Sequence, residues 1–322
     1  MSGRWLAGKV AAAIVTLLFV LIFNFFLFRI MGDPTTQLAR LPQASPEQIA
    51  ELKAGYGLDK PLVGQFLDYA GDTVTLNLGT SFRTREEVWT EIKDAIPWTL
   101  LLVGTGTLLA TLIGAWMGVK AATKRGTKTD DGLLGFSLFT YASPEYWIGI
   151  ILILVFAVAF PLFPAGQQMT PGVEFSSWFA EAWDVAQHLV LPATAMTLML
   201  LGQYFLIMRS SMVDVMTEDF ITVKRATGLS RDRVINRHAV PNALLPLVTL
   251  SAIQFGAVAG GAITIETVFS WPGLGELSFN AINDKDFPVL QGTFLVFSFG
   301  VILANLLADI LYFFLDPRVQ DR

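Results

Sequence analysis

Residues 10–28 read VAAAIVTLLFVLIFNFFLF, a run in which Thr16 and Asn24 are the only polar side chains. An apolar run of about 20 residues has the length of a helix that crosses the hydrocarbon core of a bilayer. Arg4 and Lys9 precede it in the manner of a secretory signal. The run is longer than the apolar part of such a signal, and no small-residue cleavage site follows it. It therefore predicts an uncleaved first transmembrane helix.

The rest of the chain holds five more segments of this kind. They occupy residues 98–119, 133–160, 189–208, 243–265 and 289–315. A helix satisfies its own backbone hydrogen bonds in lipid, and these runs lack the alternation of barrel strands. With 53% hydrophobic and only 15% charged residues, the chain has more apolar surface than a water-soluble domain buries. The sequence predicts an all-α integral membrane protein with six transmembrane helices.

Lys and Arg are distributed unevenly between the two sides of this predicted bundle. They gather near both termini and in the loops around 120–128 and 209–237, whereas the opposite short loops hold only Lys285. Cytoplasmic loops carry the excess of positive charge in membrane proteins. Both termini and both basic loops are therefore predicted to be cytoplasmic.

The segment 33–95 differs in composition from the spans on either side. It is long, mixed in charge and interrupted by several prolines, so it is predicted to form a small extracytoplasmic subdomain. The chain then divides into 1–32, which holds the first helix, the subdomain 33–95, and a five-helix core over 96–322.

Composition also excludes several kinds of site. The net charge of −5 argues against a nucleic acid partner. The chain has no Cys, and its two histidines, His188 and His238, are far apart in the sequence and match no metal-binding spacing. We expect neither a bound metal nor a catalytic residue.

The cytoplasmic loop at about 209–242 is the most informative segment. Apolar residues recur near helical spacing in its first half, at Met212, Met216, Phe220, Val223 and Ala226. This pattern predicts an amphipathic helix. The helix is predicted to stop at Gly228, because glycine tolerates the left-handed conformation found at helix C-termini.

A second helix is predicted to follow at once, with Ser230 as its N-cap. Leu229 and Val234 have the spacing of a hydrophobic staple, which would fix the angle at which this helix leaves the turn. The product is a rigid, basic elbow at the membrane surface. A basic amphipathic helix resting on anionic lipid is the alternative, but lipid binding needs no capped turn.

This elbow resembles the EAA-type loop of the membrane subunits of binding-protein-dependent ABC importers. The loop reads TVKRATG over 222–228 and LSRDRVINRHAVPNALLP over 229–246, with Gly228 and Pro241 in the register of that motif. Thr222, Val223 and Lys224 replace the glutamate and first alanines, as in the peptide-importer branch. No GxxxxGK[ST] phosphate loop occurs in the chain, so ATP would have to be hydrolysed elsewhere.

Other motifs narrow the resemblance to the B-type permeases of dipeptide, oligopeptide and nickel importers. They are YGLDKP over 56–61, LNLGTS over 76–81, ASPEYWIG over 142–149, ETVFSWPGLG over 266–275 and LDPR over 315–318. Their order and spacing cover nearly the whole chain.

The resemblance implies a type I ABC importer permease in the bacterial cytoplasmic membrane. Its expected partners are a second permease that shares the pore, two cytoplasmic ATP-binding subunits or domains that hold ATP and magnesium, and an external binding protein that delivers peptides. Nickel or another small solute is the alternative cargo. The expected ATPase-coupling residues are Phe220, Lys224, Arg225, Ala226, Thr227, Gly228, Leu229, Ser230, Arg231 and Pro241.

Three ionisable residues lie in or beside the predicted spans: Glu145, Glu266 and Asp309. A charge at membrane depth marks a candidate gate or pore residue. Each also has a structural interpretation, since Glu145 follows Pro144, Glu266 lies near the headgroups, and Asp309 can pair with cytoplasmic basic residues.

The sequences GAWMG at 114–118 and GAVAG at 256–260 are GxxxG patterns that let helix backbones approach closely in lipid. The patterns can serve either packing inside the chain or contact with a second permease. An ion-coupled secondary transporter and an intramembrane hydrolase are weaker alternatives, because paired broken helices, an internal repeat and hydrolase motifs are all lacking.

Overall fold

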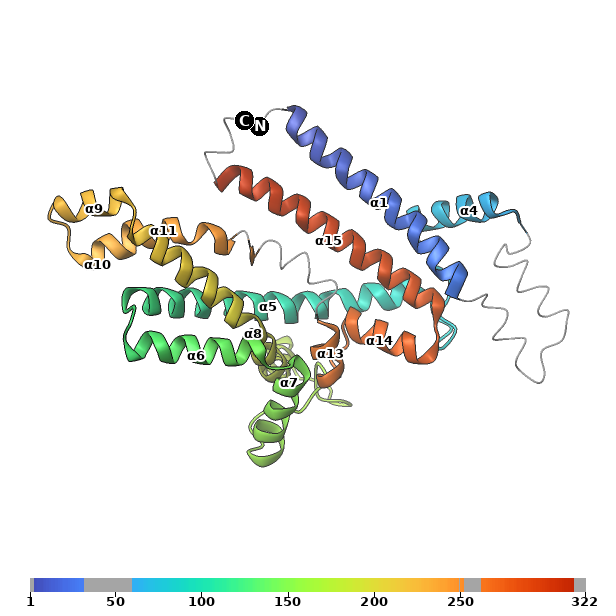
Figure 1. The fold of residues 1–322 in the computed structure, drawn as a ribbon. Coiled ribbons are helices and arrows are strands. Elements are labelled where there is room, and N and C mark those ends of the chain that lie inside the picture. The colour runs from blue at the N-terminus through green and yellow to red at the C-terminus, as the bar shows by residue number, and fades with distance from the viewer. Residues whose placement is uncertain (1–2, 32–59, 249, 252–261, 316–322) are drawn as a thin grey trace.

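A computed structural model describes residues 3–31, 60–248, 250–251 and 262–315 (Figure 1). Within these ranges the chain is mostly helical, with irregular stretches at 75–87 and 160–177 and one isolated bridge between Thr80 and Glu87. Within the described ranges, four helices are long and apolar enough to cross a membrane. They are α1 (Gly3–Met31), α5 (Val88–Thr123), α8 (Trp178–Met216) and α15 (Phe287–Leu315). These helices contain four of the six predicted spans.

The predicted span 133–160 is wrong as a single straight helix. The chain forms α6 (Lys128–Ala142), then α7 (Glu145–Ile153), which continues as a π-helical turn, η1 (Leu154–Ala159). The helix direction bends by 101° between α6 and α7. Pro144 causes the break, because a proline forces the preceding residue out of the helical region, and Ser143 is extended at ψ 138°. If this bent pair is one span, the described residues hold five.

The middle of the predicted span 243–265, residue 249 and residues 252–261, lies outside the described residues. The described part holds the end of α11 (Val240–Ala243), helical residues at 245–248 and 250–251, and the start of α13 (Ile263–Phe269). Helix α14 (Leu274–Asp284) follows α13. The GxxxG pattern at 256–260 lies outside the described residues as well. The sixth span thus stays a prediction.

Helices α5 and α8 pack against each other along a row of glycines. A Cβ atom added at Gly114 would lie 2.7 Å from the Cβ of Tyr204, and one added at Gly118 would lie 2.7 Å from the Cβ of Met208. Only glycine allows an approach this close. The first GxxxG pattern therefore serves packing inside the chain.

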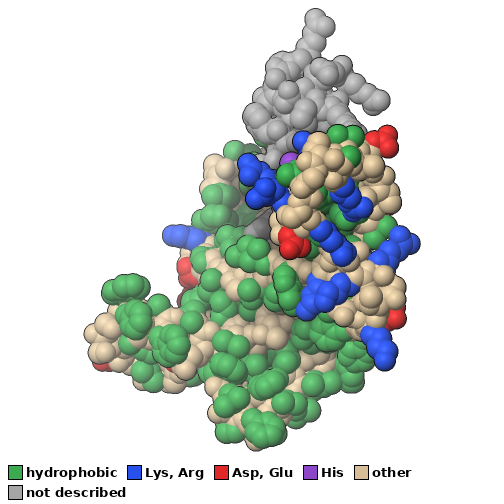
Figure 2. Space-filling model, turned by 90° about the vertical axis from the view of Figure 1, so that its left-hand side faces the viewer, with side chains coloured by type: hydrophobic (Ala, Val, Ile, Leu, Met, Phe, Trp, Pro, Cys, Tyr) green, Lys and Arg blue, Asp and Glu red, His purple; other side chains and the backbone are tan. Residues whose placement is uncertain are grey.

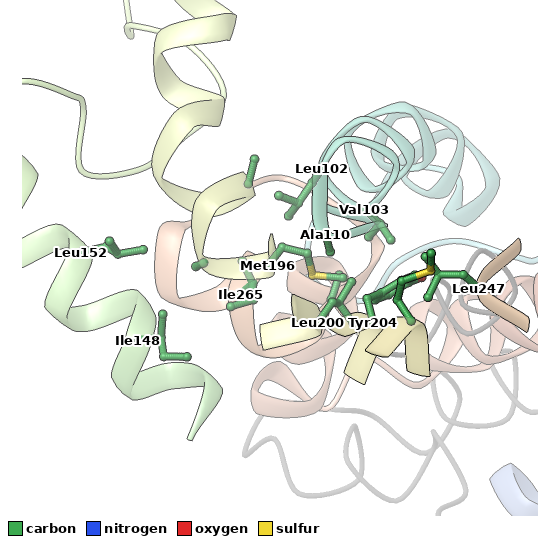
Figure 3. Packing of buried hydrophobic residues seen from close by; sticks show 14 of the residues in the cluster. Leu102, Val103, Ala110, Ile148, Leu152, Met196, Leu200, Tyr204, Leu247 and Ile265 are labelled. Atoms are coloured by element: carbon green, nitrogen blue, oxygen red, sulfur yellow. The ribbon is translucent and has the colours of Figure 1, made fainter. Parts of the chain in front are cut away.

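The main apolar core lies around this contact (Figure 3). Leu102, Val103 and Ala110 of α5 meet Met196, Leu200 and Tyr204 of α8, and Ile148 and Leu152 of α7 approach from the side. The core extends to the elbow loop through Val234 and Ile235. One continuous packed body therefore joins the elbow to the spans.

Helices α1 and α15 form a second pair that lies beside this body, and α4 (Leu62–Val74) packs on the far end of α1 (Figure 1). Lys9 of α1 forms an ion pair with Asp309 of α15, with 2.7 Å between Nζ and Oδ2. Helix α5 begins at Val88, so the predicted subdomain boundary at residue 95 falls inside a helix.

Candidate functional site

The elbow consists of α9 (Asp219–Ala226), a turn at Gly228 and α10 (Arg231–Val234). Gly228 has φ +83°, the left-handed conformation predicted for it. The N–H of Thr227 donates to the carbonyl of Val223 at 3.0 Å, and the N–H of Gly228 donates to that of Arg225 at 3.0 Å. The turn is thus closed by the last carbonyls of α9, which would otherwise lack partners.

The predicted amphipathic helix is wrong in one respect. Helix α8 ends at Met216 and α9 starts afresh after Glu218, so the apolar positions do not share one face. Met212 is fully buried in α8, whereas Phe220 and Val223 of α9 are exposed. Ile221 takes the inward position of α9 and is fully buried. The turn at 217–218 resets the helical phase.

The second half of the elbow begins where the sequence predicts. Ser230 occupies the N-cap position of α10 in an extended conformation, although its side chain makes no capping hydrogen bond in the described elbow. A π-helical turn, η2 (Ile235–Ala239), then leads to Pro241 in α11. The wider turn suits a proline, which lacks the N–H needed for a regular helical hydrogen bond.

Buried side chains fix the elbow to the spans. Ile221, Val234 and Ile235 belong to the apolar core together with Met212, and Leu229 packs against it. Leu229 and Val234 thus share one apolar cluster. The guanidinium of Arg231 also donates to the carbonyl of Thr123 at 2.8 Å, at the C-terminus of α5, where a cation is favoured. The elbow is therefore held against α5 and α8 by both apolar packing and a hydrogen bond.

The outer surface of the elbow carries both charge and apolar side chains. Figure 2 shows Lys and Arg side chains gathered on this end of the molecule. The exposed ones are Lys124, Arg125, Lys128, Arg225, Arg231, Arg233 and Arg237. Phe220 is 38% and Val223 59% exposed on α9. An exposed aromatic on a rigid, basic helix has the features of a protein docking point.

A buried ion pair at the same end was missed by the sequence reasoning. Arg209 donates from Nε to Oδ1 of Asp130 at 2.7 Å and from Nη2 to Oδ2 at 2.8 Å. Asp130 is 3% exposed and also accepts the N–H of Gly126 at 3.1 Å. The pair ties the start of α6 to α8. Its partners are far apart in the sequence, so no local pattern could indicate it.

Glu266 is placed at the opposite end of α5, and it is fully buried. Oε1 accepts the hydroxyl of Thr99 at 2.7 Å, and Oε2 accepts the N–H groups of Gly275 at 2.6 Å and Glu276 at 3.1 Å. The last two belong to the first turn of α14. A carboxylate there satisfies unpaired N–H groups and the positive end of the helix dipole. Glu266 therefore caps α14.

The turn between α13 and α14 is built around this carboxylate. Ser270 ends α13 in the left-handed conformation with φ 47°, and Trp271 is fully buried with its Nε1 donating to the carbonyl of Trp98 at 2.9 Å. A Cβ atom at Gly273 would overlap the Glu266 carboxylate. The hydroxyl of Thr99 accepts the N–H of Leu274 at 2.7 Å. Thus α13, α14 and α5 meet at one point.

The three gate or pore candidates are not brought together. Asp309 forms an ion pair with Lys9. This agrees with the structural interpretation of Asp309, in which it pairs with a basic residue. Glu145 is half-buried in the first turn of α7, where an acidic side chain is favoured by the helix dipole. Among the described residues, no three Asp, Glu or His side chains gather as a metal site would require.

The long apolar helices and the elbow packed against them are features of an integral membrane component of a transport system. Residues 110–321 match the family model described as binding-protein-dependent transport system inner membrane component, and residues 3–103 match the N-terminal model of such membrane components. The chain belongs to this family. It is a non-catalytic, multi-pass inner-membrane permease component that works with a binding protein and an ATPase.

Relatives similar over their full length support this assignment. The chain is 37% identical to a di/tripeptide transport system permease protein of Pseudomonas aeruginosa over 98% of both chains. It is 35% identical to a dipeptide transport system permease protein of Escherichia coli over 99% of both. An oligopeptide transport system permease protein of Bacillus subtilis is 34% identical, over 98% of this chain and 99% of the relative. The resemblance inferred from the motifs is confirmed.

Proposed function

We propose that this chain forms half of the pore of an ATP-driven importer for dipeptides or oligopeptides. The relatives named above transport di- and tripeptides, dipeptides and oligopeptides, and the similarity covers the whole chain. A second permease completes the pore, an external binding protein delivers the peptide, and two cytoplasmic ATP-binding subunits or domains hold ATP and magnesium. Nickel or another small solute is the alternative cargo, and uptake of labelled dipeptide or nickel separates the two.

The elbow is the proposed contact with the ATPase. The observation that carries this role is the opposed placement of neighbouring residues on α9: Ile221 is fully buried, while Phe220 and Val223 are exposed. Such a helix is anchored in the core on one side and exposes apolar side chains for a partner on the other. Lys224, Arg225, Ala226, Thr227, Leu229, Ser230, Arg231 and Pro241 complete the proposed coupling set with Phe220 and Gly228.

Helix α5 is the proposed mechanical link across the membrane. Thr123, its last residue, accepts a hydrogen bond from Arg231 of the elbow. Thr99, in the N-terminal third of α5, donates to Glu266, which caps α14. A stiff helix fixed at both ends transmits a displacement of the elbow to the outer turn at 270–276. Glu266 serves in this account as a structural cap rather than a substrate contact.

Replacing Gly228 by Val tests the coupling role. A β-branched residue at φ +83° is strained by roughly 1–2 kcal/mol, so the turn should reach its native shape about tenfold less often. We expect the assembled importer to insert and to hydrolyse ATP, but to transport less peptide per ATP. The measurement is uptake and ATP hydrolysis in proteoliposomes.

Gly126→Val is the matched control. Gly126 lies in the turn between α5 and α6 with φ +74°, and a Cβ atom meets nothing within 4 Å at either glycine. The strain is the same, but the elbow is untouched. The proposed role of the elbow would be wrong if Gly228→Val transported as much peptide per ATP as the wild type. It would also be wrong if both variants lost this ratio equally.

A further inference from the structure

Helix α4 carries an apolar stripe that faces away from the rest of the described chain. Val63, Leu67 and Val74 are 71%, 63% and 83% exposed. Their spacing of four and seven residues places them on one face of the helix. A continuous row of aliphatic side chains in water is unfavourable in proportion to its area. We therefore expect these three side chains to lie in an apolar environment rather than in water.

The other faces of α4 already have partners. Phe66 and Tyr69 pack on Phe25 of α1, with ring centroids 5.5 and 5.6 Å apart. The third face is acidic: Asp68 pairs with Lys60 at 2.6 Å, and Asp72 accepts the amide of Asn77 at 3.1 Å. The helix thus has one face on α1, one polar face and one uncovered apolar face.

Contacts with α1 and α15 set the depth of α4. The amide of Asn24 donates to the hydroxyl of Tyr69 at 2.8 Å and to the carbonyl of Gln291 at 3.3 Å. The α1 span runs over Ala7–Arg29 and the α15 span over Phe287–Leu307, so Asn24 and Gln291 both lie inside spans. Asn24 precedes Arg29 by five positions, which is about 7.5 Å along the helix. The middle of α4 is therefore level with the predicted outer ends of two spans.

Helix α1 also exposes apolar side chains around Phe25, the residue on which α4 packs. Ile22, Phe23 and Phe26 of α1 are between 44% and 48% exposed, and exposed apolar side chains of a membrane span face acyl chains. Figure 1 shows α4 lying beside this end of α1. We propose that α4 is embedded in the outer leaflet, with Val63, Leu67 and Val74 among the acyl chains and the acidic face at the headgroups. This placement does not depend on the cargo.

Single cysteines test the proposal cleanly because the chain has none of its own. Leu67→Cys reports on the stripe, and Asp72→Cys is the matched control on the polar face of the same helix; both positions are exposed. The assembled importer in lipid nanodiscs is treated with a water-soluble thiol reagent, with the wild-type chain as background. Leu67→Cys should react roughly tenfold more slowly, because apolar surroundings disfavour the reactive thiolate.

A nitroxide label at the same positions distinguishes lipid from protein. Oxygen concentrates in hydrocarbon, whereas a charged nickel chelate stays in water. The label at position 67 should be relaxed by oxygen and not by the chelate, and the label at position 72 should be relaxed by the chelate. Relaxation of label 67 by the chelate would place the stripe in water, and protection from both would place it against another protein; either result overturns the proposal.

Discussion

Glu266 shows how far the role of one residue depends on partners that are distant in the sequence. The carboxylate lies next to a predicted span and has the features of a pore residue. Thr99, its hydroxyl partner, lies 167 positions away, and the two backbone donors belong to a turn whose shape depends on Ser270 and Gly273. Only the folded chain shows that this charge caps a helix.

The hydrogen bonds of Thr99 give a residue-scale prediction. Thr99→Val keeps the shape but leaves the N–H of Leu274 and one oxygen of Glu266 without their partner in a buried site. We expect a loss of about 1–3 kcal/mol in stability, measured as a lower melting temperature of the purified complex. Thr16→Val is the control, because Thr16 is exposed on α1 and bonds only within its own helix. Equal melting temperatures for the two variants would refute the role of Thr99.

Gly228 is the opposite case, since its conformation was predictable from the sequence. A left-handed residue at a helix end is a local requirement, and glycine meets it without help from distant contacts. The same holds for the N-cap position of Ser230. Local backbone signals thus located the turn, whereas the ion pair between Asp130 and Arg209 needed the fold.

At the scale of the elements, hydropathy located the long helices but not their breaks. The apolar run 133–160 continues across Ser143 and Pro144, so its length predicts one span although the chain bends there by 101°. The elbow loop shows the same limitation, because the turn after Met216 resets the helical phase that the spacing of apolar residues implied. A break depends on one or two backbone positions. Hydropathy averaged over a window of residues does not detect such a local change.

The packing of α5 on α8 gives an element-scale prediction. In Gly114→Ala the new methyl group would lie 2.7 Å from the Cβ of Tyr204 and 3.1 Å from the backbone N of Phe205. The helices must separate, at a cost of about 1–3 kcal/mol. Gly132→Ala in α6 is the control, since its Cβ meets nothing within 4 Å. A melting temperature of Gly114→Ala equal to that of the control would show that the contact is loose.

Helix α9 allows two neighbouring residues to be separated by role. Phe220→Ala should leave the melting temperature unchanged but lower peptide uptake, because Phe220 is exposed on the proposed docking side. Ile221→Ala should instead destabilise the protein by about 2–5 kcal/mol, because Ile221 is fully buried in the core. Full uptake by Phe220→Ala would contradict docking through this side chain.

The whole molecule consists of a body around α5 and α8, to which the elbow is fixed, and a peripheral pair, α1 and α15, which carries α4. Four spans and the bent pair follow from the described residues, and the family assignment follows from the full-length similarity. Within this arrangement the elbow and the outer turn sit at opposite ends of α5. In this family the ATPase is a separate component, so the proposed coupling needs such a connection.

Uptake of a radiolabelled dipeptide into proteoliposomes tests whether this chain belongs to an ATP-driven peptide importer. The complete importer is reconstituted with the binding protein outside and ATP inside, and labelled nickel is supplied in a parallel reaction. We predict dipeptide accumulation that requires both ATP and the binding protein, with no binding of ATP by this chain alone. Uptake driven by an ion gradient without ATP, or accumulation of nickel and not of dipeptide, would contradict it.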